Sequence, residues 1–351
     1  MLAKAIRACS QGVIRKQAFA TLTIREGICT AMEDEMRRDE KVFLMGEEVA
    51  QFDGAYKVSK GMLAKFGPRR VIDTPIAEAG FAGIGVGAAL YGLKPIVEFM
   101  TFNFAMQAID QIVNSAAKGC YMSGGNLKCP IVFRGLNGPP TGVAAQHAQC
   151  YAAWYGNCTG LKVVAPWNME DCRGLLKAAI RDGNPVVCLE NELMYSQSFD
   201  INDRIMDPNF VLPIGKLKIE KEGKDISIVS YSRGVGLSLQ AAELLEKDHG
   251  IKAEVINLRS IKPMDRDGIV ASIKKTHRIL TVEEGWPQSG VGAEIAALCM
   301  ETDAYNYLDA PLERVASAEV PLPYSLPLEN ASRPMPHNIV NAALRVCYRN
   351  K

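Results

Sequence analysis

Strand-like and helix-like patterns of apolar positions alternate along most of the chain. Apolar residues three and four positions apart predict an amphipathic helix at 23–39, with Ile24, Ile28 and Met32 on one face. The apolar run at 41–49 ends at Gly46 and predicts a short buried strand, which leaves Glu47 at the strand's carboxyl end. Further strands are predicted at 69–76, 94–102, 129–138, 161–167 and 184–190, and helices at 83–92, 103–122 and 172–182. This alternation predicts an α/β domain with a largely parallel sheet covered by helices on both faces.

A second, smaller alternation follows a break in the pattern. The segment at 198–213 carries several charges, an Asp-Pro pair and a second proline, which are typical of a linker. Beyond it, strands are predicted at 225–232, 252–263 and 278–285, and helices at 236–250, 265–276 and 290–301. We therefore assign residues 21–200 to a first α/β domain, 201–222 to the linker and 223–351 to a second α/β domain.

Composition excludes several classes of function. Of 351 residues, 48% are hydrophobic and 23% are charged, which is typical of a globular chain. The 40 basic and 39 acidic residues give a net charge of +1, too neutral for a nucleic-acid binder. No run of 18 apolar residues occurs, so we expect no membrane insertion. The ten cysteines are scattered without a C-x-x-C pair, which favours buried free thiols in a reducing compartment.

The first 20 residues predict a targeting segment. Residues 1–25 contain no Asp or Glu, whereas Lys4, Arg7, Arg15 and Lys16 are basic. Apolar residues recur among them at helical spacing, and such a basic amphipathic helix is typical of a mitochondrial transit peptide. A surface helix of the mature protein is the alternative.

Glu78 is the first candidate for chemistry. We expect it in a loop between the strand at 69–76 and the glycine-rich helix at 83–92, at the sheet edge where ligands bind in parallel α/β domains. Its neighbours Ile76, Ala77, Ala79 and Phe81 are apolar, and burial would raise its pKa and suit it to proton donation. A capping carboxylate is an equally good interpretation of the pattern alone.

His147 is the second candidate. It is one of four histidines and lies in a loop rich in glycine and alanine after the strand at 129–138. Phe104, with Phe99 and Phe102, could offer a stacking face to a heteroaromatic ring, although core aromatics are the simpler interpretation.

A weaker pattern suggests a cation site. Asp182 and Asn184 follow the helix at 172–182, and their oxygens together with carbonyls at the helix end could hold a hard cation. An ordinary helix stop at Gly183 is the alternative. The GIGVGA run at 83–88 matches the dinucleotide fingerprint only loosely, and we interpret its glycines as a means of close packing. P-loop, H-E-x-x-H and G-x-S-x-G motifs are absent from the sequence.

Six motifs occur in a fixed order between about Leu22 and the C-terminus. They are FLMGEEVAQFDGAYKVSKG, RVIDTPIAEAGFAGIGVGAA, PIVEFMTFNFAMQAIDQIVNSAAK, GVAAQHAQC, KVVAPW and NPVVCLENELMY. Together they resemble the beta subunits of the decarboxylating component of pyruvate dehydrogenase complexes. The resemblance implies an α/β thiamine-diphosphate-binding fold, with a pyrimidine-type parallel-sheet domain followed by a C-terminal transketolase-like domain. The resemblance also implies that the protein is located in the mitochondrial matrix.

The resemblance implies a role for each candidate. Glu78 would contact N1′ of the cofactor's aminopyrimidine, with Phe104 beside the ring and Ile76 and Gln107 in the same pocket. His147 would be the active-site histidine near the entrance for substrate or the lipoyl group. Five positions would form a structural potassium site: Ile131, Ala179, Ile180, Asp182 and Asn184. A carboxyl group at N1′ favours the imino tautomer of the cofactor, which activates thiazolium C2 for attack on the 2-oxo carbon.

The same family implies partners. Enzymes that bind thiamine diphosphate through Mg²⁺ use a G-D-G motif followed by N-N, and this sequence has no G-D-G. We therefore expect an alpha subunit to supply the diphosphate and Mg²⁺ site in an α₂β₂ heterotetramer that feeds acetyl-CoA formation. The resemblance gives the C-terminal domain an assembly role, with Asp309 facing the subunit-binding domain of the dihydrolipoyl acetyltransferase core, whose lipoyl domains would visit the active site. A beta subunit of branched-chain 2-oxoacid dehydrogenase and a non-catalytic scaffold paralogue are the alternatives.

Overall fold

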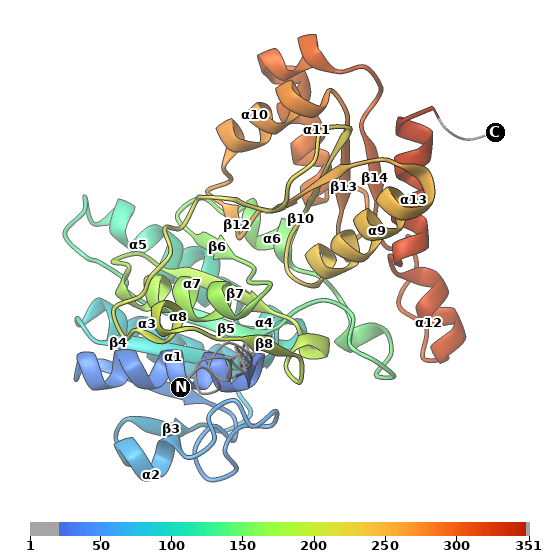
Figure 1. The fold of residues 1–351 in the computed structure, drawn as a ribbon. Helices are drawn as coiled ribbons and strands as arrows, with labels where there is room; N and C mark the ends of the chain where they lie inside the picture. The colour runs from blue at the N-terminus through green and yellow to red at the C-terminus, as the bar shows by residue number, and fades with distance from the viewer. Residues whose placement is uncertain (1–20, 349–351) are drawn as a thin grey trace, which may run out of the picture.

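A seven-stranded sheet forms the centre of the first domain. The computed structural model describes residues 21–348, and Figure 1 shows their arrangement. The strand order is β12-β6-β7-β5-β4-β2-β3, and every pairing is parallel except that of β12 with β6. The strands are β2 (Val42–Gly46), β3 (Val71–Asp73), β4 (Lys94–Thr101), β5 (Val132–Leu136), β6 (Lys162–Val164), β7 (Val186–Glu190) and β12 (Ser260–Lys262). The predicted parallel α/β domain is confirmed.

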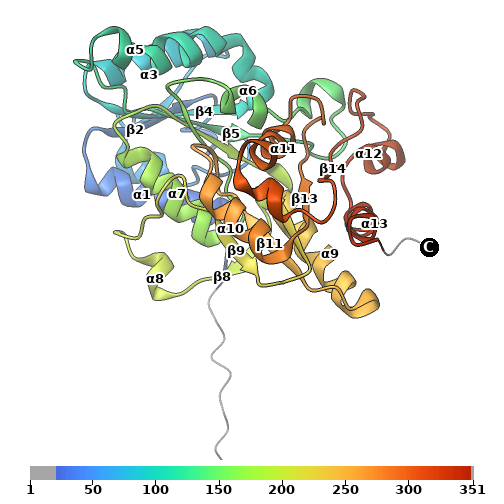
Figure 2. The same ribbon diagram turned by 90° about the horizontal axis from the view of Figure 1, so that it is seen from above.

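Helices cover both faces of this sheet (Figure 2). On one face α1 (Ile24–Arg38) packs against α7 (Met169–Arg181), and Ile28 and Met32 join a core with alternate residues of the strands. On the other face lie α3 (Glu78–Leu90) and the segment from 102 to 122, which share a second core with Phe81 and Phe99. The alternation of side chains along each strand supplies one set of apolar residues to each layer.

The predicted helix at 103–122 is not continuous. It consists of α4 (Phe102–Ala105), the 3₁₀ turn η1 (Met106–Ala108), the π-helical η2 (Gln111–Ala116) and α5 (Ala117–Met122). The apolar spacing of the sequence is compatible with each of these pitches, so it could not reveal the change. Irregular helical turns of this kind are frequent at functional sites.

A five-stranded sheet forms the centre of the second domain. Its order is β14-β13-β10-β11-β9, with only β9 antiparallel. The strands are β9 (Lys218–Lys221), β10 (Ile226–Ser230), β11 (Ala253–Asn257), β13 (Ile279–Val282) and β14 (Glu313–Val315), so β9 lies inside the segment 201–222. On one face α9 (Arg233–His249) packs against α13 (Pro336–Val346), and on the other lie α10 (Arg266–Thr276) and α11 (Val291–Glu301). Gly250 closes α9 with a left-handed φ of 66°, in agreement with the predicted helix end.

The predicted strand at 252–263 is two strands that belong to different sheets. Between β11 and β12, Arg259 adopts a left-handed φ of 59°, and β12 then joins the sheet of the first domain. The Arg259 side chain also forms a buried ion pair with Asp171 of α7, with Nε and Oδ1 2.7 Å apart. The two domains are therefore joined by a shared strand as well as by side chains.

Shorter elements complete the described region. They are β1 (Thr21–Thr23), which pairs with β8 (Ser198–Asp200), α2 (Met62–Phe66), η3 (Ala145–His147), α6 (Ala152–Gly156), η4 (Glu192–Met194), α8 (Asp203–Met206), η5 (Asp303–Tyr307) and α12 (Leu326–Ser332). Within residues 21–348 we find no helix long and apolar enough to cross a membrane. Cys129, Cys172 and Cys188 are buried free thiols, as the scattered cysteines predict. The predicted transit peptide at 1–20 lies outside the described residues.

Candidate active site

Glu78 is the first residue of α3, so our placement of this residue in a loop is wrong. Ala77 precedes it in the N-cap position and makes no side-chain capping bond. The Glu78 side chain is buried, with 3% of its surface exposed, whereas Ile76 in the preceding turn is 82% exposed. Ala79 and Gly80 are also exposed. A buried carboxyl group thus lies beneath an exposed rim of apolar and small residues.

One glycine of the GIGVGA run, Gly85, allows the close packing that we inferred from this motif. A Cβ added at Gly85 would lie 2.7 Å from a methyl carbon of Val97 in β4. Any larger residue at 85 would push α3 away from the sheet. The short helix-to-sheet distance holds Glu78 near the carboxyl ends of β2 and β3.

Glu47 is a buried carboxyl group whose main charged neighbour is Glu78. It follows β2, whose Gly46 pairs with Asp73 at the end of β3. Burial, followed by the neighbouring Glu78 carboxylate, raises the pKa of Glu47 to about 7, and its Oε1 has no hydrogen-bond partner. Near neutral pH the Glu47 carboxyl group therefore still binds a proton in a substantial fraction of the molecules. Sequence analysis placed Glu47 at the strand end but assigned it no role; its position beside β3 at the same sheet edge was the available signal.

His147 and Phe104 lie against each other. Their ring centroids are 5.2 Å apart with an interplanar angle of 79°, an edge-to-face contact. Nδ1 of His147 is buried without a hydrogen-bond partner. The backbone N–H of Gln149 donates to Oδ1 of Asn103 at 3.1 Å, which fastens the histidine loop to the residue before Phe104. The structure therefore brings these two candidates, distant in sequence, to one place.

The segment that carries Phe104 also borders α3. Both α4 and η1 pack against α3, and Gln107 of η1 is exposed. The pyrimidine-pocket candidates Glu78, Ile76, Phe104 and Gln107 thus come from two neighbouring segments at one edge of the domain. Asp309 lies elsewhere, on the exposed surface of the second domain after η5, where its carboxylate is 3.4 Å from Nη2 of Arg278.

The five residues of the predicted potassium site come from α7, from its turn into β7 and from the residue before β5. Ile131 precedes β5, whose Val132 pairs with Val186 of β7, while Ala179, Ile180, Asp182 and Asn184 belong to α7 and its turn into β7. Asp182 Oδ1 accepts hydrogen bonds from the backbone and side-chain N–H groups of Asn184, each at 3.0 Å, and Oδ2 pairs with Lys162. Burial favours a higher pKa for Asp182, but the hydrogen bonds from Lys162 and Asn184 outweigh it and lower the pKa. The Lys162 ammonium group already supplies one positive charge here, so carbonyl oxygens would provide most of the coordination of a second cation.

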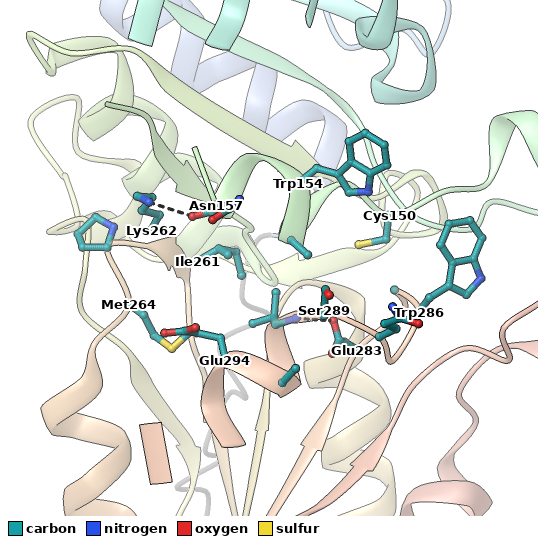
Figure 3. A pocket seen from close by; sticks show the side chains of 18 of the residues that line it. Cys150, Trp154, Asn157, Ile261, Lys262, Met264, Glu283, Trp286, Ser289 and Glu294 are labelled. Atoms are coloured by element: carbon teal, nitrogen blue, oxygen red, sulfur yellow. Dashed lines mark hydrogen bonds between the residues drawn. The ribbon is translucent and has the colours of Figure 1, made fainter. Parts of the chain in front are cut away.

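A cavity of about 1020 Å³ lies between the two domains (Figure 3). Cys150 and Trp154 of the first domain face Trp286 and Glu294 of the second across it. Neither Glu78, Phe104 nor His147 lines this cavity, which is therefore distinct from the candidate active site. Glu283 on its wall is already engaged, because its carboxylate accepts the N–H groups of Val291 and Gly292 at the start of α11.

Comparison with known proteins identifies both domains. Residues 20–197 match the pyrimidine binding domain of transketolase, and residues 215–339 match the transketolase C-terminal domain. The beta subunit of the mitochondrial pyruvate dehydrogenase E1 component from Dictyostelium discoideum is 61% identical over 97% of this chain and 95% of its own. The corresponding human subunit is 60% identical over 93% of this chain and 90% of its own.

The fold also has a counterpart among solved structures. A chain described as a split gene transketolase in an inactive beta4 tetramer superposes with a TM-score of 0.73 at 23% sequence identity. It covers 94% of this chain and 99% of its own. At that level of identity the likeness concerns the fold, and it agrees with the thiamine-diphosphate-type architecture inferred from the motifs.

Proposed function

The chain belongs to the family of pyruvate dehydrogenase E1 component beta subunits, and we propose that it forms, with an alpha subunit, a mitochondrial thiamine-diphosphate-dependent pyruvate dehydrogenase. In this reaction pyruvate loses CO₂, and its two-carbon unit passes as an acetyl group to a lipoyl group, whose disulfide is reduced. The lipoyl group belongs to a dihydrolipoyl acetyltransferase core, and the reaction takes place in the mitochondrial matrix. The relatives named above favour pyruvate over the branched-chain and scaffold alternatives.

One observation carries the proposal: a buried pair of carboxyl groups beneath an exposed apolar rim. Glu78 and Glu47 form the pair, and the exposed Ile76 and the ring of Phe104 offer apolar contact to a flat heterocycle. Two buried polar atoms nearby, Oε1 of Glu47 and Nδ1 of His147, lack partners within the described chain. Buried polar atoms normally have partners, so this region fits an aminopyrimidine with its own donors and acceptors.

Thiamine diphosphate, when bound, supplies the carbon centre that attacks the 2-oxo group and stores the electrons released with CO₂. The chain's own residues manage protons and position. Glu78 would hold a hydrogen bond at N1′ of the pyrimidine, and Glu47, whose pKa is raised to about 7, would hold a proton beside it. His147 would accept or donate a proton as the acetyl group leaves for the lipoyl sulfur, a task suited to imidazole near neutral pH. Gln107 would line the same pocket.

The alpha subunit would hold the diphosphate and Mg²⁺. The sequence lacks G-D-G, and within residues 21–348 no three His, Cys, Asp or Glu side chains cluster in a way that could hold a metal ion. The exposed Ile84 on α3 continues the apolar rim away from Glu78, at 67% exposure. An apolar surface beside a half-built site fits a partner subunit that completes it. We place this contact in an α₂β₂ heterotetramer.

Two peripheral sites complete the proposal. K⁺ would bind at the end of α7 among Ile131, Ala179, Ile180, Asp182 and Asn184, where it would tie the helix to β5. Asp309 would contribute negative charge to the docking surface for the acetyltransferase's subunit-binding domain, since it is exposed and its carboxylate is only loosely paired with Arg278.

The test is pyruvate decarboxylation with thiamine diphosphate and Mg²⁺, using the chain alone and co-expressed with an alpha subunit. We expect activity only from the pair, and a loss of about 100-fold or more for Glu78→Gln, because a positioned acid or base contributes this much. Glu48→Gln, an exposed neighbour of the pair, is the matched control and should retain activity. Activity from the lone chain, or full activity of the Glu78→Gln chain co-expressed with the alpha subunit, would overturn the assignment. Branched-chain 2-oxoacids in the same assay would test the alternative substrate.

A further inference from the structure

The loop that carries His147 is fastened to the second domain. This loop, residues 137–151, connects β5 to α6 and runs beside α12 in both views (Figures 1 and 2). The backbone N–H of Gly142 donates to Oε2 of Glu329 in α12 at 2.9 Å. Nη1 of Arg333 donates to the carbonyl oxygen of Pro140 at 3.4 Å. These contacts join positions almost 190 residues apart in sequence.

Both fastening side chains are buried and paired with each other. Glu329 has 0% of its surface exposed and Arg333 has 9%, and their charged groups are 3.0 Å apart. Burial of a carboxylate is costly unless hydrogen bonds and an opposite charge compensate for it. Glu329 obtains the opposite charge from Arg333 and a hydrogen bond from the backbone of the loop. The loop is therefore part of what makes this buried pair stable.

The loop needs an external support. Gly138, Gly142 and Ala144 have left-handed φ values of 86°, 73° and 64°, and only the short η3 interrupts its irregular path. Ala144 is three residues before His147 and pays a conformational cost in this region. Such a backbone persists only where neighbouring structure holds it.

A second acid supports the beginning of the loop. Oε2 of Glu284 accepts a hydrogen bond from Nδ2 of Asn191 at 2.9 Å, and it would lie 3.3 Å from a Cβ placed on Gly138. Glu284 is itself paired with Arg233 of α9. Nδ2 of Asn191 also donates to the carbonyl oxygen of Asn137 at 3.5 Å, so the second domain reaches the start of the loop indirectly, through Glu284 and Asn191, and contacts its middle through Glu329.

We propose that Glu329, with Arg333, is a positioning residue that sets the place of His147 for acetyl transfer to the lipoyl group. The inference rests on the proposed function and deepens it. It assigns the second domain a part in the chemistry, where the family resemblance led us to expect assembly alone. Glu329 touches neither substrate nor cofactor in this account; it acts through the backbone of the loop.

The test uses the chain co-expressed with its alpha subunit and three single variants. Glu329→Gln removes the charge of the pair, and Arg333→Lys keeps the charge but shortens the reach to Pro140. Glu254→Gln is the matched control, because Glu254 is also 0% exposed and paired with a lysine in the second domain, Lys275, away from the loop. Hydrogen exchange of peptides covering 138–148 is the first readout. We expect exchange about tenfold faster in Glu329→Gln, as for a lost hydrogen bond to a charged acceptor, and unchanged in Glu254→Gln.

The second readout separates the two half-reactions. Decarboxylation is followed with an artificial electron acceptor, and acetyl transfer with an isolated lipoyl domain. Glu329→Gln should lower acetyl transfer by about tenfold while decarboxylation changes less than about threefold, the same split as His147→Ala. In the double variant with His147→Ala, Glu329→Gln should cause no further loss, because both act through one imidazole.

Each outcome decides the proposal. Unchanged exchange in Glu329→Gln, or losses that multiply in the double variant, would overturn it. If Glu329→Gln does not assemble, the same comparisons with Arg333→Lys take its place, with effects of about threefold expected for the weaker contact. A wild-type pair without pyruvate activity would contradict the proposed function, whereas the exchange experiment would still decide whether Glu329 holds the loop.

Discussion

Replacement of Glu47 by glutamine tests the raised pKa of this buried carboxyl group directly. The change keeps the shape of the side chain and removes its charge. Burial and the adjacent Glu78 raise the pKa of Glu47 from its ordinary 4.5 to about 7. A carboxyl group with a raised pKa in the folded state destabilises that state as the pH rises. Below pH 4.5 Glu47 is protonated in both the folded and the unfolded chain. Between pH 4.5 and 7 it stays protonated only in the folded chain, so the folded state loses stability as the pH rises. Above pH 7 Glu47 is ionised in both states, and the full cost of the buried charge remains.

The size of the effect follows from the shift. One pKa unit corresponds to about 1.4 kcal/mol, so the whole shift would cost the folded chain roughly 3 kcal/mol at pH 8. Screening by solvent around the carboxyl group reduces this to about 1–2 kcal/mol. For a domain the size of the first one, that energy corresponds to about 2–8 °C in Tm. Glu47→Gln should therefore gain about 2–8 °C over the wild type when the pH is raised from 5 to 8.

Thermal unfolding of the heterotetramer without thiamine diphosphate, at pH 5, 6, 7 and 8, measures this difference. Glu78→Gln should show the same trend to a smaller extent, because it removes the neighbouring charge that contributes to the raised pKa of Glu47 but leaves Glu47 buried. Glu48→Gln should show a difference from the wild type that does not change with pH, since Glu48 is exposed. A pH-independent difference for Glu47→Gln, or one that shrinks as the pH rises, would refute the account of the pair.

Two further predictions concern the peripheral sites. Replacement of K⁺ by tetramethylammonium should lower the Tm of the heterotetramer by a few degrees, because a K⁺ concentration above the Kd of the site stabilises the folded state by about 1 kcal/mol or more. Asp182→Ala should remove this dependence on K⁺. If the Asp182→Ala variant keeps the dependence, any K⁺ binds elsewhere. Asp309→Ala should weaken binding to the subunit-binding domain of the acetyltransferase by about three- to tenfold and reduce the salt dependence of this binding. Asp303 is an exposed acid of η5 paired with Lys274, and Asp303→Ala should change neither quantity. Calorimetric titration at two salt concentrations distinguishes the two variants.

Local patterns in the sequence were sufficient for the elements that are buried on both faces. The run before Gly46 and the run at 184–190 are strands because continuous apolar side chains are stable only between two layers. Glu78 and His147 could be singled out as candidates, since each is an isolated polar residue among apolar or small neighbours. The start of α3 at Glu78 could not be predicted, because neither a capping side chain nor a proline marks it.

The features that sequence analysis missed depend on contacts between distant segments. The pKa of Glu47 is raised by burial and by the charge of Glu78, which lies on a different element, and neither effect can be read from the apolar pattern. The crossing of β12 into the first sheet depends on the backbone of Arg259 and its ion pair with Asp171. Periodicity reports burial along one segment, whereas these effects arise where two segments meet.

The contacts between the domains argue against a division into one chemical and one structural half. β12 covers the edge of the first sheet at β6, so removal of the second domain would expose an unpaired strand edge. Arg259 compensates the buried charge of Asp171, which would otherwise remain unpaired inside the first domain. Glu329 holds the backbone of Gly142 five residues before His147. Each contact supplies from the second domain something that the first domain lacks, and the last lies next to the proposed acetyl-transfer histidine. The two domains therefore form one structural unit, in which the geometry of the histidine loop depends on residues beyond the matched pyrimidine-binding region.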